Sequence, residues 1–235
     1  MLLYFLLIFP FRARREVLAV HVDIAEAMRY LGAESDAATE ALVREAAAEL
    51  EQRVQPRFVY RVLPVTASEE GAALASLHLP GSMAARMLKD ATHAAVLVCT
   101  LGAGFEALLR ACEARDMARA VALDACGSAF VEAGCDAARR EIAERFPGLY
   151  LTDRFSPGYG DLPLTVQPDL LAVTDARRRL GVTLTESLLM VPSKSVTAIL
   201  GISDTPQPAR VRGCAYCSLN QTCTFRKRGM TCAAS

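Results

Sequence analysis

The segment from Arg154 to Pro163 (RFSPGYGDLP) has the residue types best suited to binding a small molecule. Its prolines and glycines restrict the backbone, so it can present amides and carbonyls with little loss of entropy on binding. Arg154 offers a planar donor fork for a carboxylate, and Tyr159 offers a ring and a hydroxyl. Gly158 lets a ligand approach the backbone. These features suit a zwitterionic amino acid joined to a flat base. A rigid connector whose arginine caps a helix end is the alternative.

A second group with chemical potential is a cluster of cysteines near the C-terminus. It comprises Cys214, Cys217, Cys223 and Cys232. Thiolates at these spacings can converge on one metal centre, either zinc or an iron–sulfur cluster. A tail without metal is the alternative. The other four cysteines lie in apolar stretches, where a small buried thiol is expected. Unpaired core thiols favour a reducing compartment, so we place the protein in the cytoplasm.

A third candidate is the stretch Gly102 to Ala107 (GAGFEA), which fits the pattern G-x-G-x-x-A. It follows a predicted strand and opens a predicted helix, as a dinucleotide site requires. The acid about 20 residues further on, Asp124, should end a second strand but lies in a helical run. We therefore favour a tight strand-to-helix turn over a dinucleotide site.

Apolar periodicity predicts the elements that position these residues. We expect helices over 23–31, 35–54, 83–89, 105–114, 117–145 and 168–180, and strands over 57–65, 73–79, 93–101, 184–191 and 193–202. There is no steady alternation of strand and helix, which favours an α+β fold over a doubly wound sheet. The expected architecture is a mixed, largely antiparallel sheet with long flanking helices and a cysteine-rich C-terminal tail. We divide the chain into an N-terminal segment (1–22), an α+β domain (23–205) and the tail (206–235).

Composition excludes several classes of partner. The 26 basic residues balance the 26 acidic ones, and the chain has no Trp. A nucleic-acid surface needs a basic excess and stacking aromatics, so no nucleic-acid partner is expected. The apolar run of residues 1–11 is too short to span a bilayer, which takes about 20 residues, and no membrane partner is expected. We interpret this run as a mis-assigned start, with a short interfacial anchor as the alternative.

Three motifs resemble the activation domain of cobalamin-dependent methionine synthase. RFSPGY (154–159) is similar to its Arg-Pro-Ala-Pro-Gly-Tyr segment. LTES (184–187) followed by SVT (195–197) resembles its Leu-Thr-Glu-Ser and the strand after it. LDACGSAFVE (123–132) resembles its long helix. The order and spacing of the two close motifs agree, and the wider likeness runs from about Arg57 to Ile202.

The resemblance implies a binding site for S-adenosylmethionine. By motif, the ligand would contact Arg154, Ser156, Gly158 and Tyr159. Ser156 stands where the family pattern has Ala, and a contact through its backbone survives that change. A helix acid also contributes in the family. The alignment leaves Ser128 and Glu132 open for this position, and we favour Glu132.

The resemblance also implies partners. The family presents S-adenosylmethionine to an oxidised, inactive cobalamin, which is methylated with an electron from a flavodoxin-type donor. This chain lacks the cobalamin-holding signature Asp-x-His-x-x-Gly, so we expect a separate cobalamin-binding methyltransferase as partner. A ferredoxin-type donor is the other candidate for the electron. The resemblance says nothing of the cysteine tail.

The resulting hypothesis is an S-adenosylmethionine-binding accessory protein for reductive methylation and reactivation of cobalamin in a partner methionine synthase or corrinoid methyltransferase. It needs no general base, because the reduced cobalt is the nucleophile. A metal- or redox-sensing protein built around Cys214, Cys217, Cys223 and Cys232 is the alternative.

Overall fold

An antiparallel sheet forms the centre of the protein. The computed structural model describes residues 12–13, 20–32, 36–206 and 221–222. The strand order is β4-β3-β2-β5-β9-β6, and β1 (Arg12–Ala13) pairs with β2. The long strands are β2 (Arg57–Ser68), β5 (His93–Thr100) and β9 (Ser195–Ser203), and the short ones are β3 (Gly71–Leu74), β4 (Leu77–Pro80) and β6 (Tyr150–Leu151). Every pairing is antiparallel. The predicted α+β class is confirmed.

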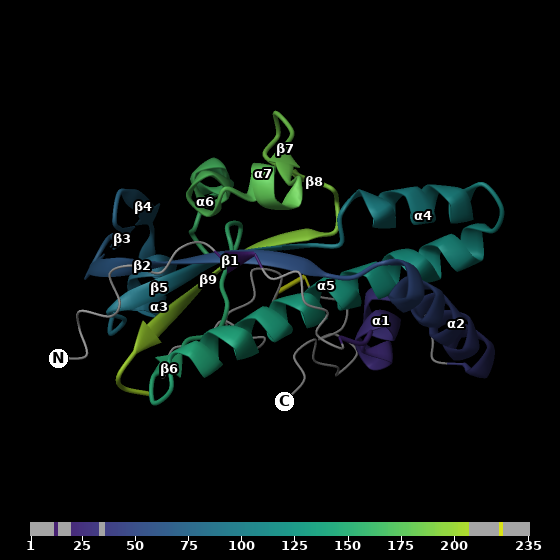
Figure 1. Cartoon of the computed structure of the whole chain (residues 1–235), viewed down its shortest axis with the longest axis horizontal. Helices are drawn as coiled ribbons and strands as arrows, with labels where there is room; N and C mark the ends of the chain where they lie inside the picture. Colours follow the sequence, from purple (N-terminus) through teal and green to yellow (C-terminus); the bar gives the residue numbers. More distant parts are fainter. Residues whose placement is uncertain (1–11, 14–19, 33–35, 207–220, 223–235) are drawn as a thin grey trace.

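Helices cover both faces of this sheet (Figure 1). On one face lie α1 (Ile24–Leu31), α2 (Ala37–Arg53) and the long α5 (Met117–Arg145). On the other lie η2 (Leu164–Val166), α6 (Gln167–Thr174), α7 (Ala176–Leu180) and the hairpin of β7 (Thr183–Leu184) and β8 (Met190–Val191). α3 (Ser82–Leu88) follows β4, and α4 (Ala103–Glu113) lies along the first part of α5. No helix of these described ranges is long and apolar enough to cross a membrane.

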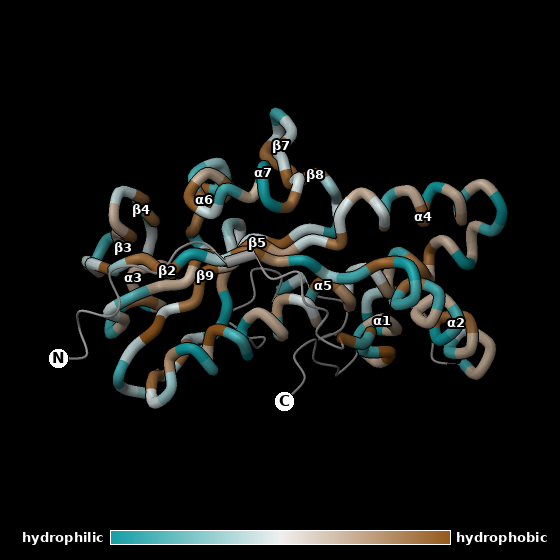
Figure 2. The backbone as a smooth tube through the Cα atoms, in the orientation of Figure 1, coloured by the Kyte–Doolittle hydropathy of each residue, from teal (hydrophilic) through white to brown (hydrophobic). Residues whose placement is uncertain are grey.

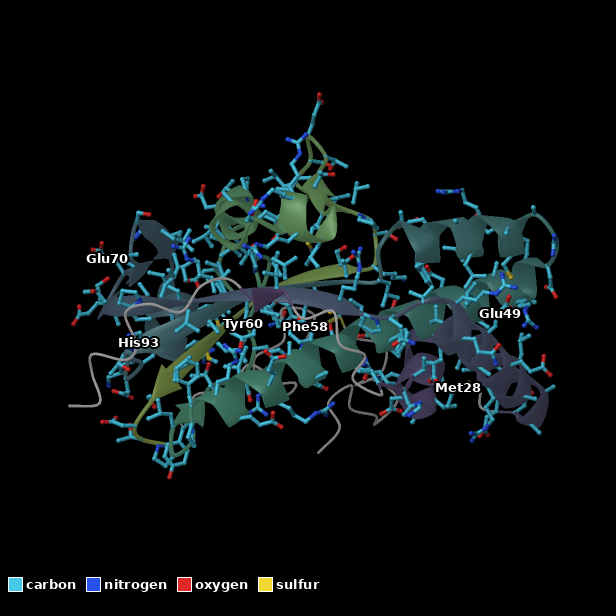
Figure 3. All side chains as sticks on the ribbon, in the orientation of Figure 1. Met28, Glu49, Phe58, Tyr60, Glu70 and His93 are labelled. Carbon is cyan, nitrogen blue, oxygen red and sulfur yellow. The ribbon has the colours of Figure 1, made fainter. Side chains whose placement is uncertain are left out.

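The two-residue repeat of a strand explains how the sheet supports both layers. Along β5, Ala95, Leu97 and Cys99 join the core under α5, whereas Ala94 and Val96 join the core on the opposite face. Successive side chains of a strand point to opposite faces, so a strand covered on both sides is apolar throughout. Figure 2 shows this hydrophobic centre in brown. In Figure 3, Phe58 and Tyr60 of β2 lie on the α5 side, in the same core.

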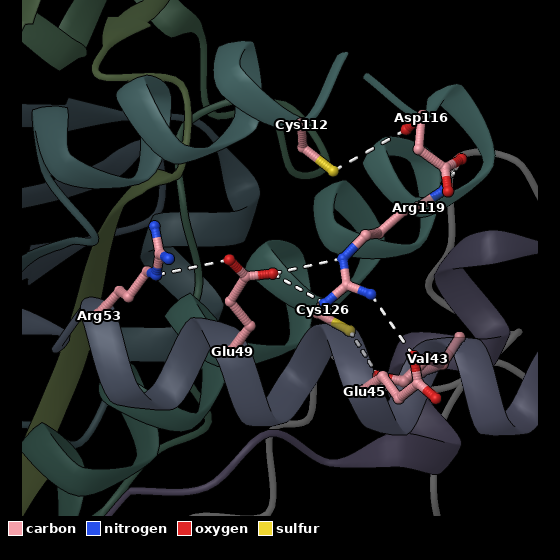
Figure 4. A network of polar contacts seen from close by, with 8 residues as sticks. All are labelled: Val43, Glu45, Glu49, Arg53, Cys112, Asp116, Arg119 and Cys126. Carbon is pink, nitrogen blue, oxygen red and sulfur yellow. Dashed lines mark hydrogen bonds and ion pairs between the residues drawn. The ribbon is translucent and has the colours of Figure 1, made fainter. Parts of the chain in front are cut away.

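Ion pairs attach the start of α5 to α2 (Figure 4). The Nη2 of Arg119 lies 2.9 Å from Glu49 Oε2, and its Nη1 lies 3.4 Å from Glu45 Oε2. On the other side of the network, Arg53 Nε lies 3.4 Å from Glu49 Oε1. These side chains are partly exposed, so each pair contributes little by itself. Below them, the buried thiol of Cys126 donates to the carbonyl of Val43 at 3.5 Å.

Asp116 caps the N-terminus of α5, where its Oδ1 accepts a hydrogen bond from the amide of Arg119 at 3.1 Å. We expect Asp116→Ala to lower the free energy of unfolding by about 1 kcal/mol, because an orphan amide of the first turn loses its partner. Urea unfolding followed by circular dichroism measures the change. Glu113→Ala, at an exposed position just before the cap, is the control. Equal losses in the two variants would contradict the capping role.

Three elements that the sequence predicts as continuous are each divided in the structure. Each break lies at a residue with left-handed backbone angles that is not a glycine, a conformation that residue type alone seldom reveals. The breaks are at Ala75 (φ 54°, between β3 and β4), Asp175 (φ 55°, between α6 and α7) and Leu188 (φ 64°, in the β7–β8 hairpin).

Candidate functional site

The candidate loop begins beside strand β9. Phe155 is fully buried, and its amide and carbonyl both pair with Ile199 of β9, at 3.1 and 2.8 Å. Just before it, the hydroxyl of Thr152 accepts a hydrogen bond from the amide of Gly201 at 2.8 Å. These contacts fix the backbone on either side of Arg154. The position of the Arg154 side chain is therefore set by the sheet.

The far end of the loop is attached to α3. The carboxylate of Asp161 accepts hydrogen bonds from the first two amides of that helix, Ser82 N at 2.6 Å and Met83 N at 2.8 Å. A carboxylate at a helix N-terminus satisfies orphan donors and complements the helix dipole. The backbone hydrogen bonds from Met83 and Ser82 hold the pKa of Asp161 below its usual value. Asp161 thus ties the loop to a second element of the fold.

We expect Asp161→Asn to lower the melting temperature near neutral pH, because the charged cap is lost. The pKa of Asp161 is lowered in the folded state, so its contribution is full above the ordinary aspartate pKa. This contribution to stability is lost as the pH falls through the lowered pKa of Asp161. The difference between variant and wild type should therefore shrink in acid. Thermal unfolding across a pH series measures it, with Asp90→Asn in the exposed turn after α3 as control. A difference that is the same at every pH would exclude this explanation.

Between its two attachments the loop makes a compact turn. The amide of Gly158 donates to the carbonyl of Leu162 at 2.8 Å, and that of Tyr159 donates to Ser156 at 3.1 Å. Gly158 has a φ of +91°, and a Cβ added there would meet only the side chain of Leu164, at 3.7 Å. The space above Gly158 is therefore open. Tyr159 is 54% exposed, so part of its side chain lies at the surface.

Arg154 points from this loop to two carboxylates on one face of α5. Its Nη2 lies 3.0 Å from Glu132 Oε2 and 2.8 Å from Asp136 Oδ1. The Arg154 side chain is only 7% exposed. Desolvation opposes its charge, but the neighbouring Cys135, Glu132 and Asp136 together outweigh it and raise the pKa of Arg154. The guanidinium is therefore a permanent cation at the base of a partly exposed acidic pair.

The hydrogen-bonding capacity of Arg154 is not filled. Its Nε is buried and has no hydrogen-bond partner among the described residues. Beside the guanidinium lies the buried thiol of Cys135. A hydrogen bond with Cys99 and burial raise the pKa of Cys135 well above its usual range, so this thiol is neutral. A buried arginine donor without a protein acceptor is rare and calls for a partner such as a water or an anion.

The structure brings together two of the residues predicted from sequence, Arg154 and Glu132. Ser128, the other candidate for the helix acid, lies one turn away on α5 and accepts a hydrogen bond from Lys194 at 2.8 Å. Asp136 was missed. Its spacing of four residues from Glu132 places both acids on one helix face, and that spacing was the available signal.

Helix α1, which the sequence predicts as a helix, borders the site, and this placement was not predicted. Tyr30 at its end is 43% exposed, and the guanidinium of Arg29 lies 4.6 Å from the centre of its ring. Burial and the charge of Glu132 raise the pKa of Tyr30. The Tyr30 ring therefore lies within electrostatic reach of the acidic pair.

A pocket of about 440 Å³ lies where the end of the loop is attached to α3. It is lined by Ser82, Met83, Arg86, Gly160 and Asp161. Its lining does not include Arg154 or Glu132. Because Asp161 is already engaged in capping α3, we assign the site to the arginine and not to this pocket.

The glycine motif at 102–107 serves as a tight turn. Gly102 has a φ of +75° and connects β5 to α4. In the described part of the chain, both neighbours of β5 are antiparallel, so the parallel unit that a dinucleotide site requires is missing. Asp124 lies in α5, 3.0 Å from Lys194 Nζ. The dinucleotide alternative is therefore wrong.

The four tail cysteines, Cys214, Cys217, Cys223 and Cys232, lie outside the described residues. Within the described ranges, no group of three or more histidine, cysteine or acidic residues is placed to hold a metal ion. A metal site in the tail stays a prediction.

Comparison with known proteins identifies a family and a shared fold. Residues 82–228, more than half of the chain, match the family described as vitamin B12 dependent methionine synthase, activation domain. A solved structure described as the crystal structure of the MetH reactivation domain bound to AdoHcy has the same fold, with a TM-score of 0.68 and 14% sequence identity. The likeness covers 95% of this chain and 87% of that one. No curated protein sequence matches.

Proposed function

Because the chain belongs to the family of vitamin B12 dependent methionine synthase activation domains, we propose that it binds S-adenosylmethionine between the Arg154 loop and α5. In this role it serves the methylation and reactivation of cobalamin that a separate methyltransferase carries. One observation supports the proposal most strongly. Arg154 is a buried cation with an unfilled Nε, next to two carboxylates and an open glycine turn.

The charges of the site fit the charges of this ligand. S-adenosylmethionine carries a carboxylate, an ammonium group and a positive sulfonium. Arg154 is the donor to the carboxylate, since a guanidinium recognises that group through parallel hydrogen bonds. Glu132, whose side chain is 32% exposed, is the partner for the ammonium group. A structure of the same fold is described as bound to AdoHcy, which has the same amino-acid and adenosine parts without the transferred methyl group.

The turn supplies the remaining contacts. Ser156 contributes its backbone, Gly158 leaves room for close approach, and the partly exposed side chain of Tyr159 flanks the base. Because both ends of the loop are attached to the fold, little conformational entropy is lost on binding. The residues of this chain therefore hold and orient the ligand.

Orientation and exclusion of water are the main contributions of the chain to methyl transfer. A reduced cobalt of the partner's cobalamin would be the nucleophile that takes the methyl group from the sulfonium, with AdoHcy as the leaving group. No proton leaves the methyl group, so no general base is needed. This agrees with a site that contains a guanidinium and carboxylates already engaged in ion pairs. The electron comes from a flavodoxin- or ferredoxin-type donor, and an iron–sulfur cluster on the tail cysteines is a candidate relay for it.

Methyl transfer to the partner tests this function. The chain, S-adenosylmethionine labelled in its methyl group, a cobalamin-binding methyltransferase and a chemical reductant are incubated together. We expect label on the cobalamin only when the chain is present, and much less with Arg154→Lys, which keeps the charge but loses the planar fork. Equal transfer with and without the chain would contradict the proposal.

A further inference from the structure

Asp136 lies one helical turn beyond Glu132, on the same face of α5. Its carboxylate is 49% exposed, yet it makes the shorter contact with Arg154, at 2.8 Å. A surface acid of this kind usually points to solvent, because holding a long side chain in one geometry costs entropy. Here Asp136 is turned inward to a guanidinium that is almost completely buried.

The two carboxylates hold Arg154 differently. Asp136 Oδ1 accepts a true hydrogen bond from Nη2. Glu132 Oε2 lies 3.0 Å from the same nitrogen, a longer contact that forms an ion pair. A directional bond fixes the plane of the guanidinium, whereas an ion pair mainly balances its charge. Asp136 therefore sets the orientation of Arg154, and Glu132 is the partner that can be exchanged.

This orientation leaves one side of the guanidinium for a ligand. Among the described residues the buried Nε has no hydrogen-bond partner, and both acids contact Nη2. Once Glu132 leaves Nη2, Nε and Nη2 form one edge that can donate to a ligand. A carboxylate binds a guanidinium best through two parallel hydrogen bonds. Rotation of the guanidinium plane would misalign such a pair. Any group that prevents the rotation also controls carboxylate recognition.

We propose that Asp136 is a positioning residue that holds the Arg154 guanidinium in the plane that recognises the ligand's carboxylate. The inference rests on the proposed function and extends it to ligand specificity. Asp136 makes no contact with the ligand. Its effect is confined to ligands that carry the carboxylate, and Glu132 is released from Arg154 to pair with the ligand's ammonium group.

Two ligands separate this role from a structural one. S-adenosylmethionine carries the carboxylate and its decarboxylated analogue does not, while both carry the amine and the sulfonium. We expect Asp136→Ala to raise the Kd for S-adenosylmethionine about tenfold, or about 1.4 kcal/mol, and to leave the Kd for the analogue unchanged. Asp136→Asn keeps a hydrogen-bond acceptor without the charge, so its Kd for S-adenosylmethionine should lie between those of the wild type and Asp136→Ala. This variant replaces the alanine variant if that protein does not fold.

Glu144→Gln, an exposed acid on the same helix, is the matched control and should change neither Kd. Equal weakening of both ligands by Asp136→Ala would show a general structural effect and overturn the inference. An unchanged preference for the carboxylated ligand would overturn it as well, while leaving the proposed function intact. Wild-type protein that binds neither ligand would remove the proposed function itself, and this inference with it.

Discussion

Arg154→Ala will weaken the binding of S-adenosylmethionine about a hundredfold, or about 3 kcal/mol. The substitution removes charge-assisted hydrogen bonds to the ligand's carboxylate, each of which contributes about 1.5–3 kcal/mol. It also leaves Glu132 and Asp136 without their cation, so the remaining acids repel that carboxylate. Isothermal titration of the ligand into variant and wild type measures the loss.

Two further variants make this result interpretable. Arg154→Lys keeps a cation near the two acids, so the fold is retained, but it lacks the planar fork and should still bind at least about tenfold more weakly. Arg115→Ala, at an exposed position between α4 and α5, should bind as wild type does. Undiminished binding by a folded Arg154→Ala protein would move the ligand away from this loop.

Gly127→Leu will destabilise the fold by about 3 kcal/mol. Gly127 lies in α5, and a Cβ added there would stand 2.5 Å from the ring of Phe105 in α4. That ring is completely buried and cannot move aside without disturbing its neighbours. A larger side chain would also press on Lys194, whose Cε is 3.3 Å from the same Cβ position, and break its contact with Asp124.

Gly104→Leu is the matched control for this substitution. Gly104 lies in the first turn of α4, and a Cβ added there meets nothing within 4 Å. Because leucine has the higher helix propensity, this variant should be neutral or slightly more stable. Urea unfolding measures the free energy of unfolding of the wild type, Gly127→Leu and Gly104→Leu. A Gly127→Leu protein as stable as Gly104→Leu would show that the contact of α4 with α5 is looser than the structure indicates.

Local patterns were sufficient to predict most elements. The helices predicted over 23–31 and 35–54 are α1 and α2, where the structure shows Asp23 and Asp36 as N-caps, and the apolar run of β5 is a strand buried on both faces. Capping and periodicity depend on neighbours in sequence, so they can be read without the fold. The division of predicted elements at Ala75, Asp175 and Leu188 could not be read, because residues other than glycine seldom adopt the left-handed conformation found there.

The site was predictable in its residue types but not in its connections. The composition of the loop indicated Arg154 as a hydrogen-bond donor to a ligand's carboxylate. The resemblance to a family indicated an acidic residue on a helix. The pairing of Arg154 with Asp136, 18 residues apart, depends on how α5 and the loop return along the same sheet. The approach of Tyr30 depends on the packing of α1 against α5, which no local pattern encodes.

Titration of S-adenosylmethionine into the wild-type chain is the most direct test of the central claim. We predict saturable binding of one ligand per chain at micromolar concentrations, without any partner present. Absence of saturable binding up to high micromolar concentrations, both alone and with a cobalamin-binding methyltransferase, would contradict the assignment of this site.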